Sequence, residues 1–334
     1  MTGLQPLPGQ DRGALEADLA RAEEVASHDR SNMWKVSQFM TDPARYEAFI
    51  AMYAVMRVVD DLVDALPASR GLDPALRAST LETLAAWESR ISAALRGAPA
   101  EEPLDRALAA ASMQFPLSPT LWTNFVSAMR RDVDHDRFED DRVFLEYAEG
   151  ATAAPTTIYL YLLASQPGED GRYLIAPRQD GFDLLTCGRD LGVFAYMAHI
   201  LRDIADDLRL GDRGRIYLPL SDLASCGLTE EDFTATGLGR PPDARWDRLV
   251  ERVAARARAR RDAGSRAARA RYPAMAPDCR FILALIIGTY SRLLDRIAEE
   301  PRSMLGGGGI PLDQAGLAAD AAREAGYSPS PGGA

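Results

Sequence analysis

Apolar residues recur with the period of an α-helix along most of the chain, in segments rich in Ala, Leu, Arg and Glu that Pro and Gly separate. No convincing run of alternating apolar and polar residues predicts a β-strand. The sequence therefore predicts an all-α fold. We expect helices at 13–28, 43–66, 74–96, 103–115, 118–131, 140–164, 180–209, 243–272 and 277–299.

The composition indicates one large domain with a core of its own. Of the 334 residues, 47% are hydrophobic and 26% are charged, which excludes disorder for the bulk of the chain. We expect a single domain over 1–301 and a mobile tail over 302–334, where GGGGIP and SPSPGGA disfavour a packed helix. Segment 210–242 reads as a long loop, and long loops in compact domains are often functional.

The charge and the absence of export signals limit the possible partners and location. A net charge of −11 opposes a nucleic-acid partner, because such binding depends largely on Lys and Arg. No signal peptide and no apolar stretch of about 20 residues is found, and three scattered cysteines suit a reducing compartment, so we expect a cytoplasmic protein. The Arg-rich segment 252–271 is interpreted as a solvated face paired with acids, the alternative being a surface for membrane or nucleic acid.

A first acidic cluster interrupts an otherwise apolar predicted helix at Asp60, Asp61 and Asp64. Asp60 and Asp64 are four residues apart, so they lie on one helical face about 6 Å apart along the axis. Two like charges in that position repel each other, and a divalent cation would relieve the repulsion. The alternative is a solvated helix end that carries three acids.

A second cluster repeats this spacing at Asp203 and Asp207, with Asp206 between them. Two such helices can face each other, and this number of oxygen ligands suits Mg²⁺, which binds carboxylates together with substrate phosphates. Arg57 precedes the first cluster by three residues and Arg202 directly precedes the second. Guanidinium groups bind phosphate oxygens in pairs, so the implied ligand is a diphosphate.

Three stretches resemble the squalene and phytoene synthase family. The first two are Tyr53-Ala-Val-Met-Arg57-x-x-Asp60-Asp61-x-x-Asp64, and Arg202-Asp203-x-x-Asp206-Asp207 followed by the segment from Arg213 to Pro219. The third, from Asp132 to Tyr147 and Gly150, is similar to the central helix of the family. Tyr290 lies in a stretch that looks like the last core helix, and Ser31 resembles a phosphate contact near the start. The resemblance covers roughly residues 28–299.

This resemblance implies an isoprenoid-synthase fold, in which helices surround an apolar cavity with the two aspartate helices at its mouth. It implies that Mg²⁺ and cationic side chains remove diphosphate from an allylic prenyl diphosphate, and that a second prenyl diphosphate traps the cation head to head. Tyr147 would stabilise the cation or relay a proton. The implied metal residues are Asp60, Asp61, Asp64, Asp203, Asp206 and Asp207. The implied substrate-binding residues are Ser31, Tyr53, Arg57, Arg202, Arg213, Arg215 and Tyr290.

The sequence departs from the family at the second cluster and in the central helix. His199 stands where the family usually has Asn, and Tyr196 where it has Gln. An imidazole is a poor Mg²⁺ ligand, so His199 could occupy a weakened metal position, donate a hydrogen bond to diphosphate, act as a catalytic base or reflect drift. Pro155 is expected to kink the central helix, and Glu149 is a further departure.

The resemblance favours head-to-head condensation of two prenyl diphosphates and leaves alternatives. One is a terpene cyclase or a prenyltransferase to a non-isoprenoid acceptor, suggested by Tyr196 and His199; another is a non-catalytic family member. No dinucleotide motif supports NADPH, which stays open because squalene-forming relatives use it without that motif. Peripheral membrane association would suit an apolar product.

Overall fold

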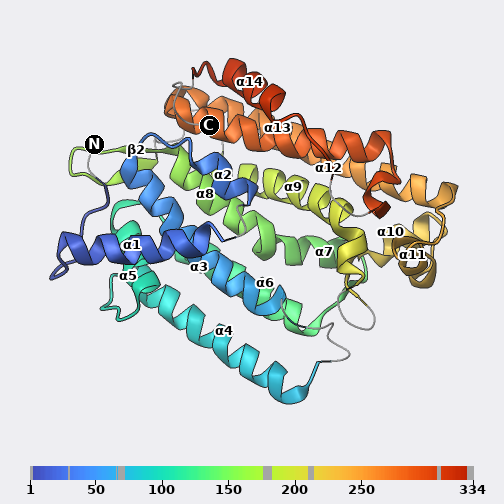
Figure 1. Ribbon diagram of the computed structural model, residues 1–334, viewed down its shortest axis with the longest axis horizontal. Coiled ribbons are helices and arrows are strands. Elements are labelled where there is room, and N and C mark those ends of the chain that lie inside the picture. The colour runs from blue at the N-terminus through green and yellow to red at the C-terminus, as the bar shows by residue number, and fades with distance from the viewer. Residues whose placement is uncertain are drawn as a thin grey trace.

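The protein is described by a computed structural model covering residues 3–28, 31–64, 66, 72–175, 183–209, 214–306 and 310–328. Within these residues nearly all regular structure is helical, which confirms the all-α prediction (Figure 1). The long helices are α1 Arg12–Ala26, α3 Pro43–Asp64, α4 Pro74–Leu95, α5 Pro103–Gln114, α6 Pro119–Asp134, α8 Ala154–Ala164, α9 Leu184–Asp207, α12 Ala244–Arg271, α13 Pro277–Glu299 and α14 Gln314–Ala325. The shorter ones are α2 Asn32–Ser37, α7 Asp141–Ala148, α10 Leu220–Ser225 and α11 Glu230–Gly237.

Four short strands supplement the helices in the described chain. Strand β1 (Arg137–Phe138) pairs in parallel with β4 (Ile216–Pro219), and β2 (Ser165–Pro167) pairs antiparallel with β3 (Tyr173–Ile175). Each is too short to show an alternating pattern in sequence. The β1–β4 pair nevertheless matters for the site, because it fastens the segment after α9 beside the end of α6.

Local sequence signals explain where the helices begin. Asp73 accepts hydrogen bonds from the backbone N–H groups of Ala75 and Leu76, and Pro74 occupies the first turn of α4. A capping carboxylate satisfies N–H groups that have no partner inside the helix, and proline loses nothing at that position. Other helices that begin at proline are α3, α5, α6 and α13.

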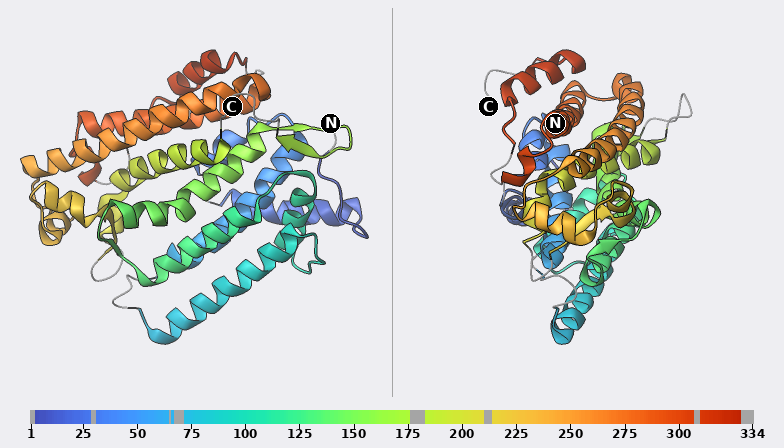
Figure 2. Two further views of the ribbon diagram at one scale, coloured as in Figure 1. Left: turned by 180° about the vertical axis from the view of Figure 1, so that it is seen from behind. Right: turned by 90° about the vertical axis from the view of Figure 1, so that its right-hand side faces the viewer.

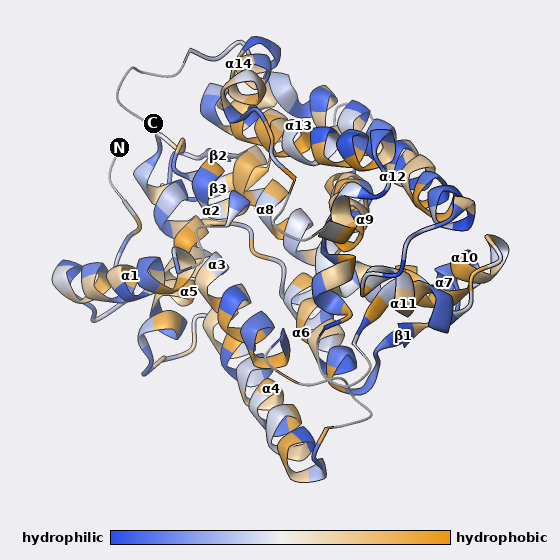
Figure 3. Cartoon of the chain, turned by 45° about the vertical axis from the view of Figure 1, so that its right-hand side comes forward, coloured by the Kyte–Doolittle hydropathy of each residue, from blue (hydrophilic) through white to orange (hydrophobic). Residues whose placement is uncertain are grey.

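The helices enclose a central space rather than stacking in two layers. Helix α9 packs against α12, α8 and α13, while α3 packs against α8 on the other side of that space (Figures 1 and 2). Figure 3 shows that most helices carry both hydrophobic and hydrophilic residues along their length, as expected when one face is buried. The buried helices α3 and α9 are the two that carry the aspartate clusters.

A π-helical turn, η2 (Glu149–Ala153), joins α7 to α8 where a kink at Pro155 was expected. The N–H of Ala154 donates to the carbonyl of Glu149, five residues back, so the turn is one residue wider than an α-helical turn. Proline has no N–H to continue the normal ladder, and it follows this turn in the first turn of α8. Glu149 forms an ion pair with Arg189 of α9.

The segment predicted as a long loop, 210–242, is more ordered than expected. Its described part contains β4, α10 and α11. A capping box between Thr229 and Asp232 begins α11, and Phe233 stacks on Trp246 with ring centroids 5.5 Å apart. Both helices are shorter than the window in which hydrophobic periodicity is visible, which explains why the sequence did not reveal them.

The tail also differs from the expectation of a segment without a packed helix. Helix α14 lies along α13 (Figure 1), and Ala321 and Ala325 are buried against the core. Glu324 pairs with Arg269 at 2.9 Å, which fastens α14 to α12 as well. Small alanines one turn apart allow two helices to pack closely. The glycines and prolines on either side of α14 led the sequence analysis to predict no packed helix here.

The Arg-rich face of α12 pairs with acids, as predicted. Arg252 and Arg256 contact Asp222 at 2.8 and 2.6 Å, and Arg260 contacts Asp190 at 2.7 Å. Asp222 is buried, so this pairing also holds α10 against α12. Separately, none of the helices in the described part is long and apolar enough to cross a membrane.

The close packing of η2 against α6 generates a stability prediction. A Cβ on Gly150 would overlap the backbone carbonyl oxygen of Asn124, and backbone cannot move as cheaply as a side chain end. We expect Gly150→Ala to lower the free energy of unfolding by about 1–3 kcal/mol, as overpacking does. Urea unfolding measures the change.

The matched control is Gly288→Ala in the middle of α13, where the nearest atom to an added Cβ is a Leu317 side-chain carbon at 3.8 Å. Because alanine favours a helix over glycine, this variant should be neutral or more stable. Equal effects of the two substitutions would contradict the packing argument.

Candidate active site

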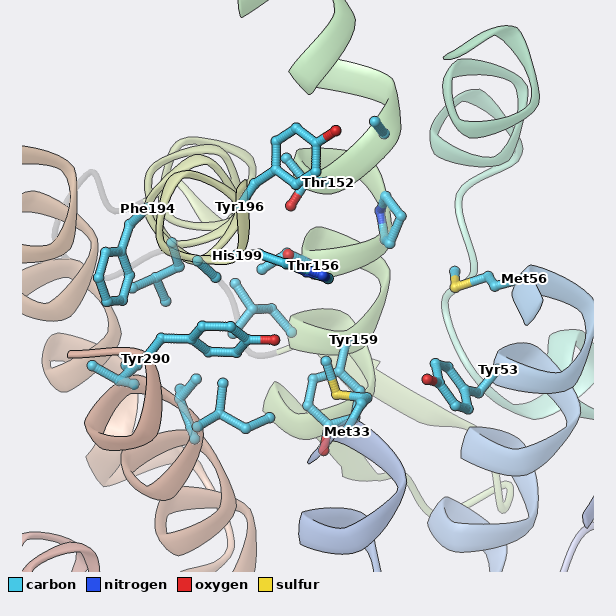
Figure 4. Close-up of a pocket in the computed structure, with 18 of the residues that line it drawn as sticks. Met33, Tyr53, Met56, Thr152, Thr156, Tyr159, Phe194, Tyr196, His199 and Tyr290 are labelled. Atoms are coloured by element: carbon cyan, nitrogen blue, oxygen red, sulfur yellow. The ribbon is translucent and has the colours of Figure 1, made fainter. Parts of the chain in front are cut away.

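Two adjoining cavities lie between the helices. An apolar chamber is lined from α3, α8, α9 and α13, and Figure 4 shows Tyr53, Tyr159 and Tyr290 approaching it from different helices. A polar cavity adjoins it and is lined mainly by carboxylates and tyrosines. Ala151, Tyr196 and His199 line both, so we call these three residues the neck.

The chamber has apolar and aromatic walls over most of its surface. Its described lining is Met33, Phe49, Met52, Tyr53, Met56, Ala151, Thr152, Pro155, Thr156, Tyr159, Leu160, Leu191, Phe194, Ala195, Tyr196, His199, Leu283, Ile286, Ile287 and Tyr290. The lining of the polar cavity is Asp60, Asp64, Met129, Asp132, Tyr147, Ala151, Tyr196, His199, Ile200, Asp203, Asp207, Arg215 and Tyr217. An apolar space thus adjoins a polar one that is lined by five carboxylates and by Arg215.

The first aspartate cluster lies at the end of α3. Asp60, Asp61 and Asp64 each offer an oxygen atom within 4.8 Å of the others, the spacing of ligands around one metal ion. Arg57 contacts Asp61 at 2.7 Å but is 3.8 Å from Asp60, and Arg215 lies 3.8 Å from Asp64. Among the residues that the structure describes, the arginines beside Asp60 and Asp64 thus lie beyond hydrogen-bond distance of these two carboxylates.

Burial is the main cause of the raised pKa values of three cavity carboxylates, those of Asp60, Asp64 and Asp207. Burial, followed by the charge of Asp64, raises the pKa of Asp60 to about 8. Burial and then the charge of Asp203 raise the pKa of Asp207 to about 7, and burial also raises the pKa of Asp64. A group of carboxylates that resists ionisation in this way gains most from a bound cation. The residues present therefore fit a divalent metal ion.

The second cluster, on α9, has a different environment. Burial alone would raise the pKa of Asp203, but hydrogen bonds from Arg202 and His199 outweigh it and hold the pKa well below its usual range. Arg202 donates to both carboxylate oxygens, at 2.5 and 2.6 Å, and Nε2 of His199 lies 2.6 Å from Oδ2. Asp203 is thus the most strongly neutralised carboxylate of the cavity.

Arg215 lines the polar cavity and contacts the ends of both helices that carry the aspartate clusters. Its side chain is buried, and it donates to the carbonyl oxygen of Val63 at 2.9 Å and to the hydroxyl of Tyr217 at 3.2 Å. The backbone N–H of Arg215 donates to the carbonyl of Asp207 at 2.8 Å. A permanently charged group is therefore fixed at the end of both aspartate helices.

Tyr147 lies in the wall of the polar cavity with its hydroxyl group on Asp132. The hydroxyl donates to Oδ2 of Asp132 at 2.8 Å, and the hydroxyl of Tyr196 lies 3.4 Å from that of Tyr147. The rings of Tyr147, Tyr196 and Tyr217 have centroids 6.2–6.4 Å apart. Burial raises the pKa of Asp132 to about 7 and raises the pKa of Tyr147 well above its usual value.

The remaining predicted residues fall into four groups. Tyr53 and Tyr290 line the chamber, and Ser31 caps α2 while its hydroxyl lies 2.7 Å from that of Tyr53. Arg57 and Arg202 contact the aspartate clusters. Asp206 is exposed and pairs with Arg209 at 3.1 Å, so the structure does not bring it to the cavity. Arg213 lies outside the described residues.

Two site residues were not among the predicted ones. Asp132 was quoted only as part of a motif, and Tyr217 only as part of the segment after Arg213. Asp132 is 6% exposed and sits in the apolar face of α6, so an acid among buried positions was the available signal. Tyr217 lies on β4, whose shortness hid its direction.

Comparison with known proteins agrees with this geometry. The model of the squalene/phytoene synthase family matches residues 25–315, most of the chain. The chain belongs to this family. It is a prenyltransferase of the squalene/phytoene synthase type, with the isoprenoid-synthase fold that the resemblance implied.

Similar proteins of this family include phytoene synthases. That of Arthrospira platensis is 29% identical over 76% of this chain and 75% of its own length. Phytoene synthase 2 of Solanum lycopersicum is 30% identical over 75% of this chain and 73% of its own length. Its phytoene synthase 1 is 29% identical, and the match spans 55% of that protein.

Solved structures share the fold at lower identity. A dehydrosqualene synthase with bound ligand has a TM-score of 0.73 and 19% identity, covering 93% of this chain and 97% of its own. A squalene synthase from Alicyclobacillus acidocaldarius has a TM-score of 0.68 and 20% identity, covering 87% of this chain and 97% of its own. In the chain described here, the neck residues Tyr196 and His199 lie where the two cavities meet.

The raised pKa of Asp132 predicts a pH-dependent stability. Between about pH 4 and 7 the native state keeps a proton that the unfolded state has lost, so the contribution of Asp132 to stability falls as pH rises. We expect Asp132→Asn to be more stable than the wild type at about pH 8, on the order of 3 kcal/mol, in metal-free buffer.

Urea unfolding at several pH values tests this expectation, and the difference should vanish near pH 4. Asp206→Asn is the control, because its exposed side chain should leave the wild-type pH dependence intact. A stability difference for Asp132→Asn that stays constant with pH would contradict the prediction.

Proposed function

We propose that this synthase ionises an allylic prenyl diphosphate and joins it head to head to a second one. The observation that supports the proposal most is the neck, where an apolar chamber meets a cavity lined by carboxylates from two helices. A prenyl chain is apolar and its diphosphate is anionic, so the two cavities match the two halves of the substrate. The family of the chain supports the same reaction class.

We assign Mg²⁺ binding to Asp60, Asp61 and Asp64, with Asp207 lining the same cavity. Hard carboxylate oxygens with raised pKa values are suited to a cation that also binds phosphate. When bound, Mg²⁺ supplies Lewis-acid stabilisation of the departing diphosphate. Arg215, fixed by its bonds to Val63 and Tyr217, adds a permanent positive charge near the same place.

Side chains at the neck and in the chamber handle the hydrocarbon. Aromatic faces stabilise an allyl cation, and the apolar chamber keeps water from it. Tyr147 holds its hydroxyl against Asp132, which accepts that hydrogen bond and has a pKa of about 7. We assign these two residues the passage of the proton that the coupled product loses. NADPH use, a cytoplasmic location and peripheral membrane association stay predictions.

The direct experiment incubates the purified protein with farnesyl or geranylgeranyl diphosphate and Mg²⁺, with and without NADPH, and identifies products by mass spectrometry. The proposal expects release of diphosphate and a product with twice the carbon number of the substrate. A product of single chain length would favour a cyclase or transfer to another acceptor instead. A folded protein that releases no diphosphate from either substrate would point to a non-catalytic family member.

The metal assignment predicts a large effect at Asp60. Asp60→Asn removes a charge from a cluster whose carboxylates lie within 4.8 Å of one another. We expect turnover to fall by two or more orders of magnitude, about 2.7 kcal/mol in barrier height, with the fold intact by circular dichroism.

The control is Asp206→Asn, which makes the same chemical change on an exposed side chain outside the cavity. It should keep turnover within a few-fold of the wild type. If Asp60→Asn retained near-wild-type turnover, or if both variants lost activity alike, the assignment would be wrong.

A further inference from the structure

A further cavity, which we call the outer cavity, lies between α12, α13 and α14, outside the active site. Figures 1 and 2 show α14 lying along α13 at this edge of the molecule. Three arginines, two acids and two serines supply the polar part of its lining. Its volume of about 430 Å³ is in the range of small-molecule sites. Ile287 lines both this cavity and the chamber, so the two are neighbours across α13.

The spacing of residues along two helices explains why the outer cavity exists. On α12, Arg261, Ser265 and Arg269 are four residues apart, so they lie on one helical face. On α13, Ala284 and Gly288 repeat this spacing and line the same cavity. Because alanine and glycine fill little volume, the two helices leave a space between them, and polar side chains surround it.

Ser265 is buried in the wall of this cavity with its hydroxyl unpaired. The residue is 6% exposed, and its side chain forms no hydrogen bond with any residue that the structure describes. A hydroxyl in a helix can instead donate to the carbonyl four residues back, as Thr289 does to Leu285 at 2.8 Å. Buried polar groups are nearly always hydrogen-bonded, so an unpaired one that lines a cavity indicates a ligand.

The three arginines of the outer cavity differ in how far other side chains occupy them. Arg261 lies 3.0 Å from Asp262, and Arg269 donates to Glu324 at 2.9 Å. Arg266 forms no ion pair or hydrogen bond within the described part of the chain. Among the lining residues, three guanidinium groups therefore face two carboxylates that are already paired. This local excess of positive charge occurs in a chain whose net charge is −11.

We propose that the outer cavity binds a small molecule that carries a phosphate group. The guanidinium of Arg266 would hold two phosphate oxygens, and the hydroxyls of Ser265 and Ser291 would donate to the others. A carboxylate fits less well, because one guanidinium occupies both of its oxygens and leaves none for the two serines. A metal ion also fits less well, since arginines already hold both acids of the cavity.

Two kinds of molecule carry such a phosphate, a dissolved phosphate ester and the headgroup of a lipid. Calorimetric titration with glycerol 3-phosphate in metal-free buffer probes the first. Sedimentation with vesicles of phosphatidylcholine, alone or mixed with phosphatidic acid, probes the second. Binding of glycerol 3-phosphate, or capture that requires phosphatidic acid, would support the site and identify its kind of ligand. If the wild type bound in neither assay, the proposal would be wrong.

A matched pair of arginine variants assigns the binding to this cavity. Arg266→Gln should bind about tenfold more weakly in whichever assay the wild type responds, because it loses a charge-assisted contact. Arg292→Gln removes the same charge from α13, one residue after Ser291 and outside the cavity lining. It should keep the wild-type affinity. Equal losses in the two variants would mean that the overall charge attracts the anion, which would overturn the proposal.

Ser265→Ala separates a ligand contact from a structural role. Without ligand it should resist urea at least as well as the wild type, because it removes a buried hydroxyl that has no partner among the described residues. With the phosphate ligand it should bind several-fold more weakly. Unchanged affinity, or a clear loss of stability without ligand, would contradict the proposal. These measurements need no turnover of a prenyl diphosphate, so their outcome is independent of the proposed function.

Discussion

Repulsion among carboxylates around one cavity is the constraint on which the rest of this structure depends. Asp60, Asp64, Asp132 and Asp207 line the same space, and burial raises the pKa of each. Such an arrangement costs stability, because burial removes water from carboxylates that also repel one another. The surrounding apolar core offsets that cost, and it is the large core of α3, α8, α9 and α13 that makes the arrangement tolerable.

The same helices separate charge from hydrocarbon. Helix α9 carries buried apolar residues along most of its length, and its acids that line the polar cavity, Asp203 and Asp207, lie in its last turns, so the chamber and the polar cavity follow one another along it. The π-helical turn before Pro155 places Ala151 across from Tyr196 and His199 at the neck. A reactive cation formed at this place would enter a chamber whose lining is mostly apolar and aromatic.

The sequence predicted the long helices well, since each has several turns of periodic apolar residues and a clear start. Helices α10 and α11 were missed because they are too short for that pattern, and α14 because glycine and proline around it hid its packing against α13. Pro155 was recognised as a departure from the family, but the wider turn that accommodates it was not foreseen. Local propensity does not determine how a chain relieves such a conflict.

For the site, the sequence by itself determined which acids share a helical face, because a spacing of four residues fixes that relation within any regular helix. It also identified the family through the motifs around Asp60 and Asp203. Only the tertiary structure decided that Asp206 turns to Arg209, that Asp132 enters the cavity, and that Asp203 is neutralised by its neighbours. Burial and charge compensation arise between elements far apart in the chain or from the rotamers that packing selects, and no local pattern encodes them.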